Sequence, residues 1–257
     1  MIRGYTAQQV RDAEKPHLAA GEPLMQRAAQ ALADRVLQLL ESRPTPSPRV
    51  LLLVGSGDNG GDALFAGAFL ARSGVFAGAD SPRAEVAVDA LGVGSRMHEA
   101  GAAAASAAGV RFLEADDATI AALRGSGDPL DAAAGYQVIV DGILGTGTSA
   151  GSPALRGTAR SAVLAIRSGL ADAAASEGAN AASRAIVVAV DIPSGVDPDS
   201  GAVADDAVLP ADLTVTFGGI KAGLLLGVGA RLAGRIDLVE IGIESDLAAM
   251  TPAVELP

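Results

Sequence analysis

The hydrophobic residues of this chain follow a helical period near the N-terminus and a strand-like pattern afterwards. From Pro23 to Leu40, apolar residues recur every three or four positions, which predicts an amphipathic helix. Thr6–Glu14 has the pattern of a shorter helix. A proline-rich segment, Ser42–Arg49, then breaks the helical pattern and separates this entry from the rest of the chain.

Six short apolar runs after this segment predict β-strands. Several are continuously apolar rather than alternating, which is typical of strands buried on both faces of a parallel sheet. The runs are Val50–Val54, Glu85–Ala90, Gln137–Asp141, Ala185–Asp191, Leu213–Phe217 and Ile236–Ile241. Helical patterns lie between them, at Leu64–Ser73, Glu99–Ala108, Thr119–Arg124 and Leu155–Ala175. This alternation predicts a three-layer α/β fold in which helices cover both faces of a mostly parallel sheet.

No linker interrupts the series of strands, so we expect a single domain over residues 1–257. Within it, residues 1–48 form the helical entry and the proline-rich linker, 49–245 the body, and 246–257 a tail. Apolar residues make up 49% of the chain but aromatic residues only 3%, so small side chains must fill the core.

Composition excludes several classes of function. The net charge of −11 argues against nucleic acid or an anionic membrane surface as the main partner, because both need a basic footprint. The chain has no cysteine, which rules out disulfides, a zinc–thiolate site and a cysteine nucleophile. Neither a signal peptide nor an apolar run of membrane-spanning length is present. We therefore expect a cytoplasmic protein.

A glycine-rich motif follows the first apolar strand. Gly55, Gly57 and Gly60 have the G-x-G-x-x-G spacing of dinucleotide sites, between a strand and a helix. Such glycines let backbone N–H groups approach an anion at a helix N-terminus, although a tight strand-to-helix turn needs glycine too. Asp58 and Asp62 would repel a phosphate, so they suit ribose hydroxyls, a cation or a helix cap. No lysine follows the glycines, which excludes a nucleoside-triphosphate P-loop.

The loop from Gly145 to Gly151 is rich in glycine and hydroxyl groups and is suited to wrapping a ligand. Its second half has the form G-x-S-x-G around Ser149, which raises the possibility of an α/β-hydrolase. That triad needs a histidine after the serine, and both histidines, His17 and His98, come before it. The chain is therefore not a hydrolase of this kind.

Oxygen-bearing side chains follow three separate strands. Asn59, Asp141 and the pair Asp191 and Ser194 each come at or just after a strand end, where open parallel sheets bind ligands. An aspartate in such a place can also simply cap a loop. If the strand order brings these residues together, they suit a hard cation rather than zinc. Lys221 follows another strand and either adds a positive charge to this rim or is a solvated loop lysine.

Four motifs in this order resemble the NAD(P)H-hydrate epimerases, the N-terminal half of bacterial bifunctional NAD(P)H-hydrate repair enzymes. The motifs are Gly55–Ala63 for the family's G-x-G-N-N-G-G-D-G, Asp141–Gly147 for D-x-x-x-G-T-G, Val190–Gly195 for V-D-I-P-S-G, and Thr216–Gly223 for T-x-x-x-x-K-x-G. The resemblance extends from about Thr6 to Ile243. Two residues depart from it: Asp58 replaces the family's first asparagine and Ala63 its last glycine.

The resemblance implies a Rossmann-like fold, a homodimer, and potassium (K⁺) held by Asn59, Asp141 and Ser194. The implied substrate is hydrated NADH or NADPH, and a dehydratase, fused to this chain or paired with it, is the implied partner. The substrate-binding residues carried over are Asp58, Asn59, Gly60, Gly61, Asp62, Gly145, Thr146, Gly147, Thr148, Ser149, Ala150, Gly151 and Asp191.

The chemistry of this substrate points to Asp191 as the catalytic residue. The hydrated ring carries a hydroxyl on a carbon next to nitrogen, so its centre can invert without redox chemistry and needs only a proton shuttle. Asp191, at the end of a buried strand, is the best candidate for the general acid/base. The alternative is a non-catalytic nucleotide-binding scaffold of the same fold, which has no need of both Asp141 and Asp191. An NAD-dependent dehydrogenase would need a substrate-polarising residue in a second domain, for which no motif is found.

Overall fold

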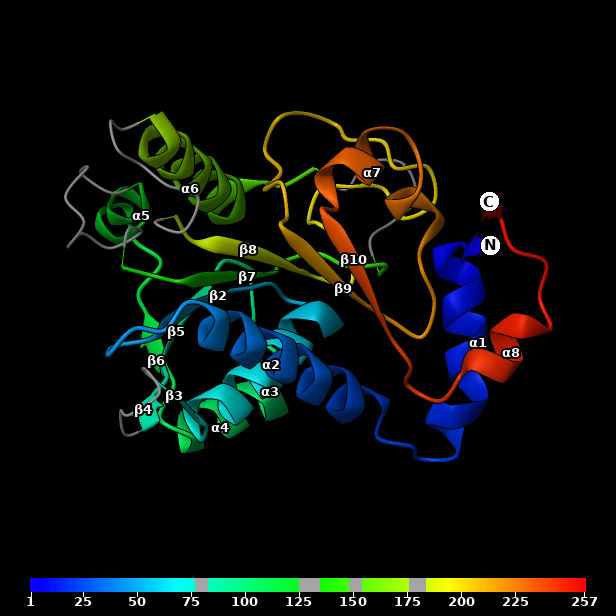
Figure 1. Cartoon of the computed structure of the whole chain (residues 1–257), viewed down its shortest axis with the longest axis horizontal. Helices are drawn as coiled ribbons and strands as arrows, with labels where there is room; N and C mark the ends of the chain where they lie inside the picture. The colour runs from blue at the N-terminus through cyan, green and yellow to red at the C-terminus, as the bar shows by residue number, and fades with distance from the viewer. Residues whose placement is uncertain (77–82, 125–134, 148–153, 176–183) are drawn as a thin grey trace.

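The centre of the molecule is a seven-stranded sheet in which every neighbouring pair of strands is parallel, in the order β10-β9-β8-β7-β2-β5-β6 (Figure 1). The computed structural model describes residues 1–76, 83–124, 135–147, 154–175 and 184–257. The strands are β2 (Arg49–Val54), β5 (Ala87–Gly92), β6 (Arg111–Leu113), β7 (Val138–Gly142), β8 (Ile186–Val190), β9 (Leu213–Phe217) and β10 (Arg235–Val239).

Helices cover both faces of this sheet, as Figure 1 shows. On one face lie α2 (Leu24–Ser42), α3 (Asp58–Ala71) and α4 (Glu99–Ala107), and on the other α5 (Asp117–Leu123) and α6 (Gly157–Ala175). Successive residues of β2 point to opposite faces: Leu52 belongs to the apolar cluster under α2 and α3, and Leu51 to the one under α6. The predicted three-layer α/β fold is confirmed.

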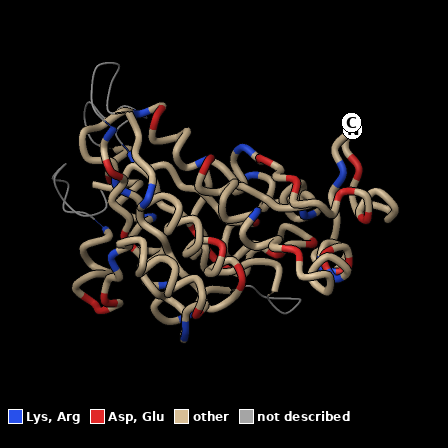
Figure 2. The backbone as a smooth tube through the Cα atoms, turned by 90° about the horizontal axis from the view of Figure 1, so that it is seen from below, with Lys and Arg blue, Asp and Glu red and all other residues tan. Residues whose placement is uncertain are grey.

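Short elements complete the fold at its edges. They are α1 (Ala7–Ala19), α7 (Gly227–Leu232), α8 (Glu244–Ala248), a 3₁₀ turn η1 (Ala222–Leu224), the hairpin β3 (Gly74–Phe76) and β4 (Arg83–Glu85), and the pair β1 (Ile2–Gly4) and β11 (Val254–Leu256). Because β1 pairs with β11 in antiparallel fashion, the two chain ends lie side by side (Figure 1). Acidic and basic residues are interspersed over the described chain, without a basic face (Figure 2). None of the described helices has the length and apolar character needed to cross a membrane.

The expected elements differ from the observed ones in three instructive places. The helix expected at Leu64 begins at Asp58, inside the glycine motif. Glycine is a poor helix former, which hid this first turn, yet a Cβ on Gly60 would lie 2.2 Å from the backbone oxygen of Gly55. The edge strand β6 was missed because it has only three residues. The first helix continues through Pro16 to Ala19 rather than ending at Glu14.

Candidate active site

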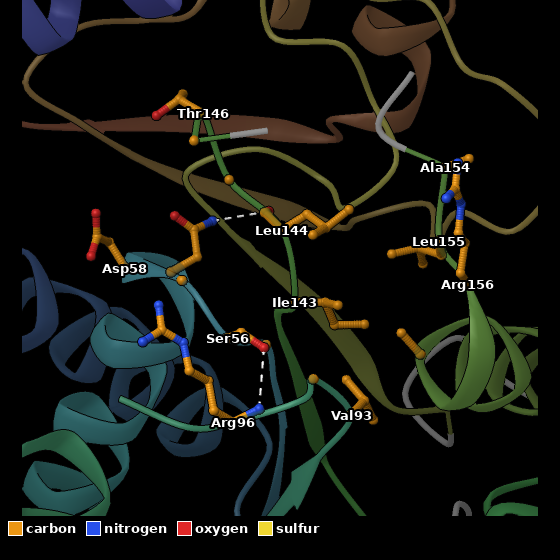
Figure 3. Close-up of a pocket in the computed structure, with 17 residues that line it drawn as sticks. Ser56, Asp58, Val93, Arg96, Ile143, Leu144, Thr146, Ala154, Leu155 and Arg156 are labelled. Atoms are coloured by element: carbon orange, nitrogen blue, oxygen red, sulfur yellow. Dashed lines mark hydrogen bonds between the residues drawn. The ribbon is translucent and has the colours of Figure 1, made fainter. Parts of the chain in front are cut away.

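A cleft of about 810 Å³ opens at the carboxyl edge of the sheet, over the ends of β2, β5 and β7. Figure 3 shows the side chains that surround it. They come from the turn after β2, the loops after β5 and β7, and the start of α6: Gly55–Asn59; Val93, Gly94 and Arg96; Ile143–Gly147; Ala154–Arg156 and Ala159. The glycine motif and the first half of the Gly145–Gly151 loop therefore face each other across one opening.

Asn59 ties three elements together at the floor of this cleft. It lies in the first turn of α3 and is buried. Its Nδ2 donates hydrogen bonds to the carbonyl oxygen of Val190, at 2.6 Å, and to that of Leu144, at 3.1 Å. The helix start is thereby held against the end of β8 and the loop after β7.

Asp141 and Ser194 lie beside Asn59 in the interior. The Ser194 hydroxyl donates to Oδ1 of Asp141 at 2.6 Å, and the Ser194 N–H donates to Oδ2 at 2.9 Å. The hydroxyl also accepts from the Leu144 N–H at 2.8 Å. Burial raises the pKa of the Asp141 carboxyl, and the bonds from Ser194 oppose that rise. The three residues expected to hold a cation thus converge on one backbone segment, at Leu144.

Asp191 occupies a strained position directly after β8. Its φ is +67°, and it is the only non-glycine residue with positive φ among those described. Such left-handed backbone conformations are costly for residues with a side chain and occur preferentially at functional sites. Oδ1 of Asp191 accepts hydrogen bonds from the Thr216 hydroxyl at 3.1 Å and from the Phe217 N–H at 3.2 Å. The loop geometry therefore fixes the direction of this carboxylate.

Lys221 completes the surroundings of Asp191 and is not a solvated loop lysine. Only 1% of its surface is exposed, and its Nζ forms an ion pair with Oδ1 of Asp191. The ammonium also donates to the Phe217 carbonyl oxygen at 2.9 Å and contacts the Thr216 hydroxyl oxygen at 3.3 Å. Of the two interpretations of Lys221, a positive charge at the rim or a solvated loop lysine, the structure supports the first.

Two further acids lie close enough to Asp191 to affect one another's protonation. Burial raises the pKa of Asp62 well above its ordinary value, and the charges of Asp191, Asp58 and Glu14 raise it further. Burial likewise raises the pKa of Glu14, which lies on α1. Burial among other acidic groups therefore disfavours the charged form of Asp62.

Helix α1 forms part of the site, which sequence reasoning missed. Arg11 donates a hydrogen bond to the carbonyl oxygen of Thr146 at 2.6 Å and so holds the loop after β7. Glu14 lies one turn further along the same helix. Arg96 and Arg156, on the cleft walls, were missed as well. Nothing in the spacing of these residues signals the site, because their place depends on how distant elements dock.

The other predicted substrate-binding residues divide into three groups. Asp58, Gly60 and Gly61 lie in the first turns of α3 rather than in a loop. Gly145, Thr146 and Gly147 line the cleft. Thr148, Ser149, Ala150 and Gly151 lie outside the described residues.

We expect Gly145→Ala to disrupt the arrangement of Asn59. A Cβ at position 145 would lie 2.1 Å from Oδ1 of Asn59, so the buried amide would have to leave its two carbonyl partners. Overpacking of this kind costs about 1–3 kcal/mol of unfolding free energy, measurable by urea denaturation. Gly147→Ala is the matched control, because a Cβ there meets no atom of the described residues within 4 Å. Equal stabilities of the two variants would contradict this geometry.

Comparisons with known proteins show which family this chain belongs to. The family model described as "YjeF-related protein N-terminus" matches residues 21–223. An NAD(P)H-hydrate epimerase of Clavibacter michiganensis subsp. michiganensis is 48% identical over 254 residues, covering 98% of this chain and 94% of the relative. An NAD(P)H-hydrate epimerase of Microbacterium testaceum is 45% identical over 253 residues, covering 98% of this chain and 84% of the relative.

Two further similarities are more distant. A bifunctional NAD(P)H-hydrate repair enzyme of Mycobacterium tuberculosis is 35% identical over 245 residues, which are 93% of this chain but 41% of the relative. The crystal structure of yeast ynu0 is similar with a TM-score of 0.63 at 18% identity, covering 86% of this chain and 83% of that chain. The yeast structure shows a shared fold.

Proposed function

Because this chain belongs to the family of YjeF-related N-terminal domains and NAD(P)H-hydrate epimerases, we propose that it interconverts the R and S epimers of hydrated NADH and NADPH. The chain is accordingly an enzyme of the isomerase class. The observation that supports the substrate most strongly is that Asn59, which lines a cleft of about 810 Å³, donates a hydrogen bond to the Val190 carbonyl, directly before the Asp191 that pairs with Lys221. That volume suits a ligand of dinucleotide size.

In this proposal Asp191 moves the proton. Asp191 first takes up a proton from water, and the C–O bond of the hydrated ring then breaks while its carboxyl group delivers that proton to the departing hydroxyl, which leaves as water. The ring nitrogen stabilises the resulting cation, and water then adds to the opposite face while the carboxylate takes up the proton it releases. The inverted product forms without any change in oxidation state. Proton transfer by a positioned side chain accelerates such steps by about 100- to 10,000-fold.

Lys221 acts as a positioning residue for this carboxylate. The contacts from Lys221, Thr216 and Phe217 all reach Oδ1 of Asp191, so Oδ2 is the oxygen left to face the substrate. The neighbouring Asp62, at the start of α3, is suited to form a hydrogen bond with a substrate hydroxyl in either protonation state.

Potassium fits the oxygen atoms around Leu144. Asn59 turns its Nδ2 to two carbonyl groups, and its Oδ1 faces the space that glycine leaves at position 145. Asp141 is fully buried, and none of the described basic side chains forms an ion pair with it. Among the described residues no three histidine, cysteine or acidic side chains gather into a metal site, so a cation here would rest on amide, hydroxyl and carboxylate oxygens together. A hard monovalent cation would offset the buried carboxylate and organise the loops that hold the substrate.

Three other properties remain predictions. The homodimer and the cytoplasmic location come from the resemblance and from the composition. A dehydratase as partner is supported by the mycobacterial relative, which is named a bifunctional repair enzyme. This chain covers 41% of that relative.

The proposed function is tested by supplying one epimer of hydrated NADPH and following the other by NMR. We expect the protein to bring the two epimers to equilibrium much faster than buffer alone, and to do so faster with potassium than with tetramethylammonium. No acceleration over buffer would refute the epimerase proposal. Acceleration that does not depend on the cation would refute the potassium proposal alone.

A further inference from the structure

Two arginines on the cleft walls have no part in the chemistry described above. Arg96 comes from the loop after β5 and Arg156 from the segment just before α6. Both are exposed, and Figure 3 shows them on different sides of the opening, Arg96 on the side where Asp58 lies. Within the described part of the chain neither forms an ion pair, whereas Arg49 and Arg111 both pair with Asp89.

These arginines reverse the charge of the cleft relative to the rest of the molecule. The charged residues that line it are two arginines and one aspartate, Asp58, while the whole chain carries a net charge of −11. Asp58 replaces an asparagine of the family motif, and its carboxylate would repel a bound anion. The guanidinium of Arg96 lies on the same side of the cleft and offsets that repulsion. Guanidinium groups match phosphate oxygens in charge and in geometry.

The strand order gives Arg96 a place along a bound dinucleotide, and Arg156 lies on the opposite wall of the same cleft. Asp191 follows β8, and the neighbours along the edge are β7, β2 and then β5. Strands lie about 4.8 Å apart, so the end of β5 is roughly 14 Å from the end of β8. A dinucleotide whose hydrated ring lies at Asp191 therefore crosses the start of α3 with its diphosphate. Its adenosine end reaches the loop that carries Arg96.

We propose that Arg156 binds the diphosphate of the substrate and that Arg96 binds the 2′-phosphate on its adenosine ribose. Because only NADPH carries this 2′-phosphate, the contact gives the enzyme a preference for hydrated NADPH over hydrated NADH. This inference rests on the proposed function, because it orients the substrate by its ring at Asp191. It concerns residues that none of the four sequence motifs contains.

The test measures binding to the 257-residue chain by calorimetry, with ADP-ribose and its 2′-phosphate as non-reacting probes. We expect Arg96→Gln to raise the Kd of the 2′-phosphate probe roughly tenfold and to leave that of ADP-ribose unchanged. Arg156→Gln should raise both Kd values roughly tenfold. The matched control is Arg72→Gln, an exposed arginine at the opposite end of α3, which should change neither.

The outcomes separate this inference from the proposed function. Equal effects of Arg96→Gln on both probes would overturn the assignment of the 2′-phosphate to Arg96. No effect of Arg156→Gln on either probe would overturn the diphosphate assignment. Arginine-dependent binding without epimerisation by the unmodified chain would instead refute the epimerase function and leave the phosphate contacts standing.

Discussion

Asp191→Asn should lower kcat for epimerisation by about 100- to 10,000-fold, because the amide keeps the shape of the carboxylate but cannot exchange a proton. KM should change little, since the cleft, the glycine motif and the arginines are untouched. The measurement follows the conversion of one purified epimer of hydrated NADPH into the other under saturating potassium. A loss of kcat without a rise in KM is the signature of an interaction made in the transition state.

Two controls separate chemistry from folding in this experiment. Circular dichroism and urea unfolding establish that the variant is folded at the assay temperature, which matters because Lys221 loses its charged partner. Asp237→Asn makes the same chemical change on the edge strand β10, where the carboxylate pairs with Arg35 at 2.6 Å. It should retain full activity. An Asp191→Asn enzyme with the unmodified kcat would show that another group transfers the proton.

The central sheet could be predicted because its signal lies within short stretches of sequence. Val50–Val54 is apolar at every position, and a strand buried on both faces requires that pattern. The oxygen-bearing residues could be proposed for a related reason, because parallel strands bring their carboxyl ends to one edge of a sheet. Whether Asn59, Asp141 and Ser194 meet there depended on the strand order, which the structure supplies by placing β2, β7 and β8 next to one another.

The parts that could not be predicted depend on contacts between distant segments. Arg11 reaches the Thr146 carbonyl over 135 positions of sequence, and no periodicity encodes that docking of α1. The ion pair of Lys221 and Asp191 requires a lysine four residues beyond the end of β9 to turn back into the core. The start of α3 at Asp58 was hidden because close packing requires glycine where helix propensity disfavours it.

Lys221→Met should lower the free energy of unfolding by about 3–5 kcal/mol, the usual cost of removing one partner from a buried ion pair. Only 2% of the Lys221 side chain and 8% of the Asp191 side chain are exposed, so solvent cannot replace the lost partner. Methionine keeps the unbranched stem of lysine, so the packing of the chain is largely preserved. Activity should fall as well, because the orientation of Asp191 depends on this contact.

The double variant Asp191→Asn/Lys221→Met tests whether an unpaired buried charge causes the loss of unfolding free energy in each single variant. Each single variant leaves one buried charge unpaired, whereas the double variant leaves none. Its loss of unfolding free energy should therefore be smaller than the sum of the two single losses, by about 2–3 kcal/mol. Urea denaturation at neutral pH and low salt measures all three variants against the unmodified chain. Additive losses would mean that Lys221 contributes through packing alone, and the positioning role of its ammonium in catalysis would then have to be abandoned.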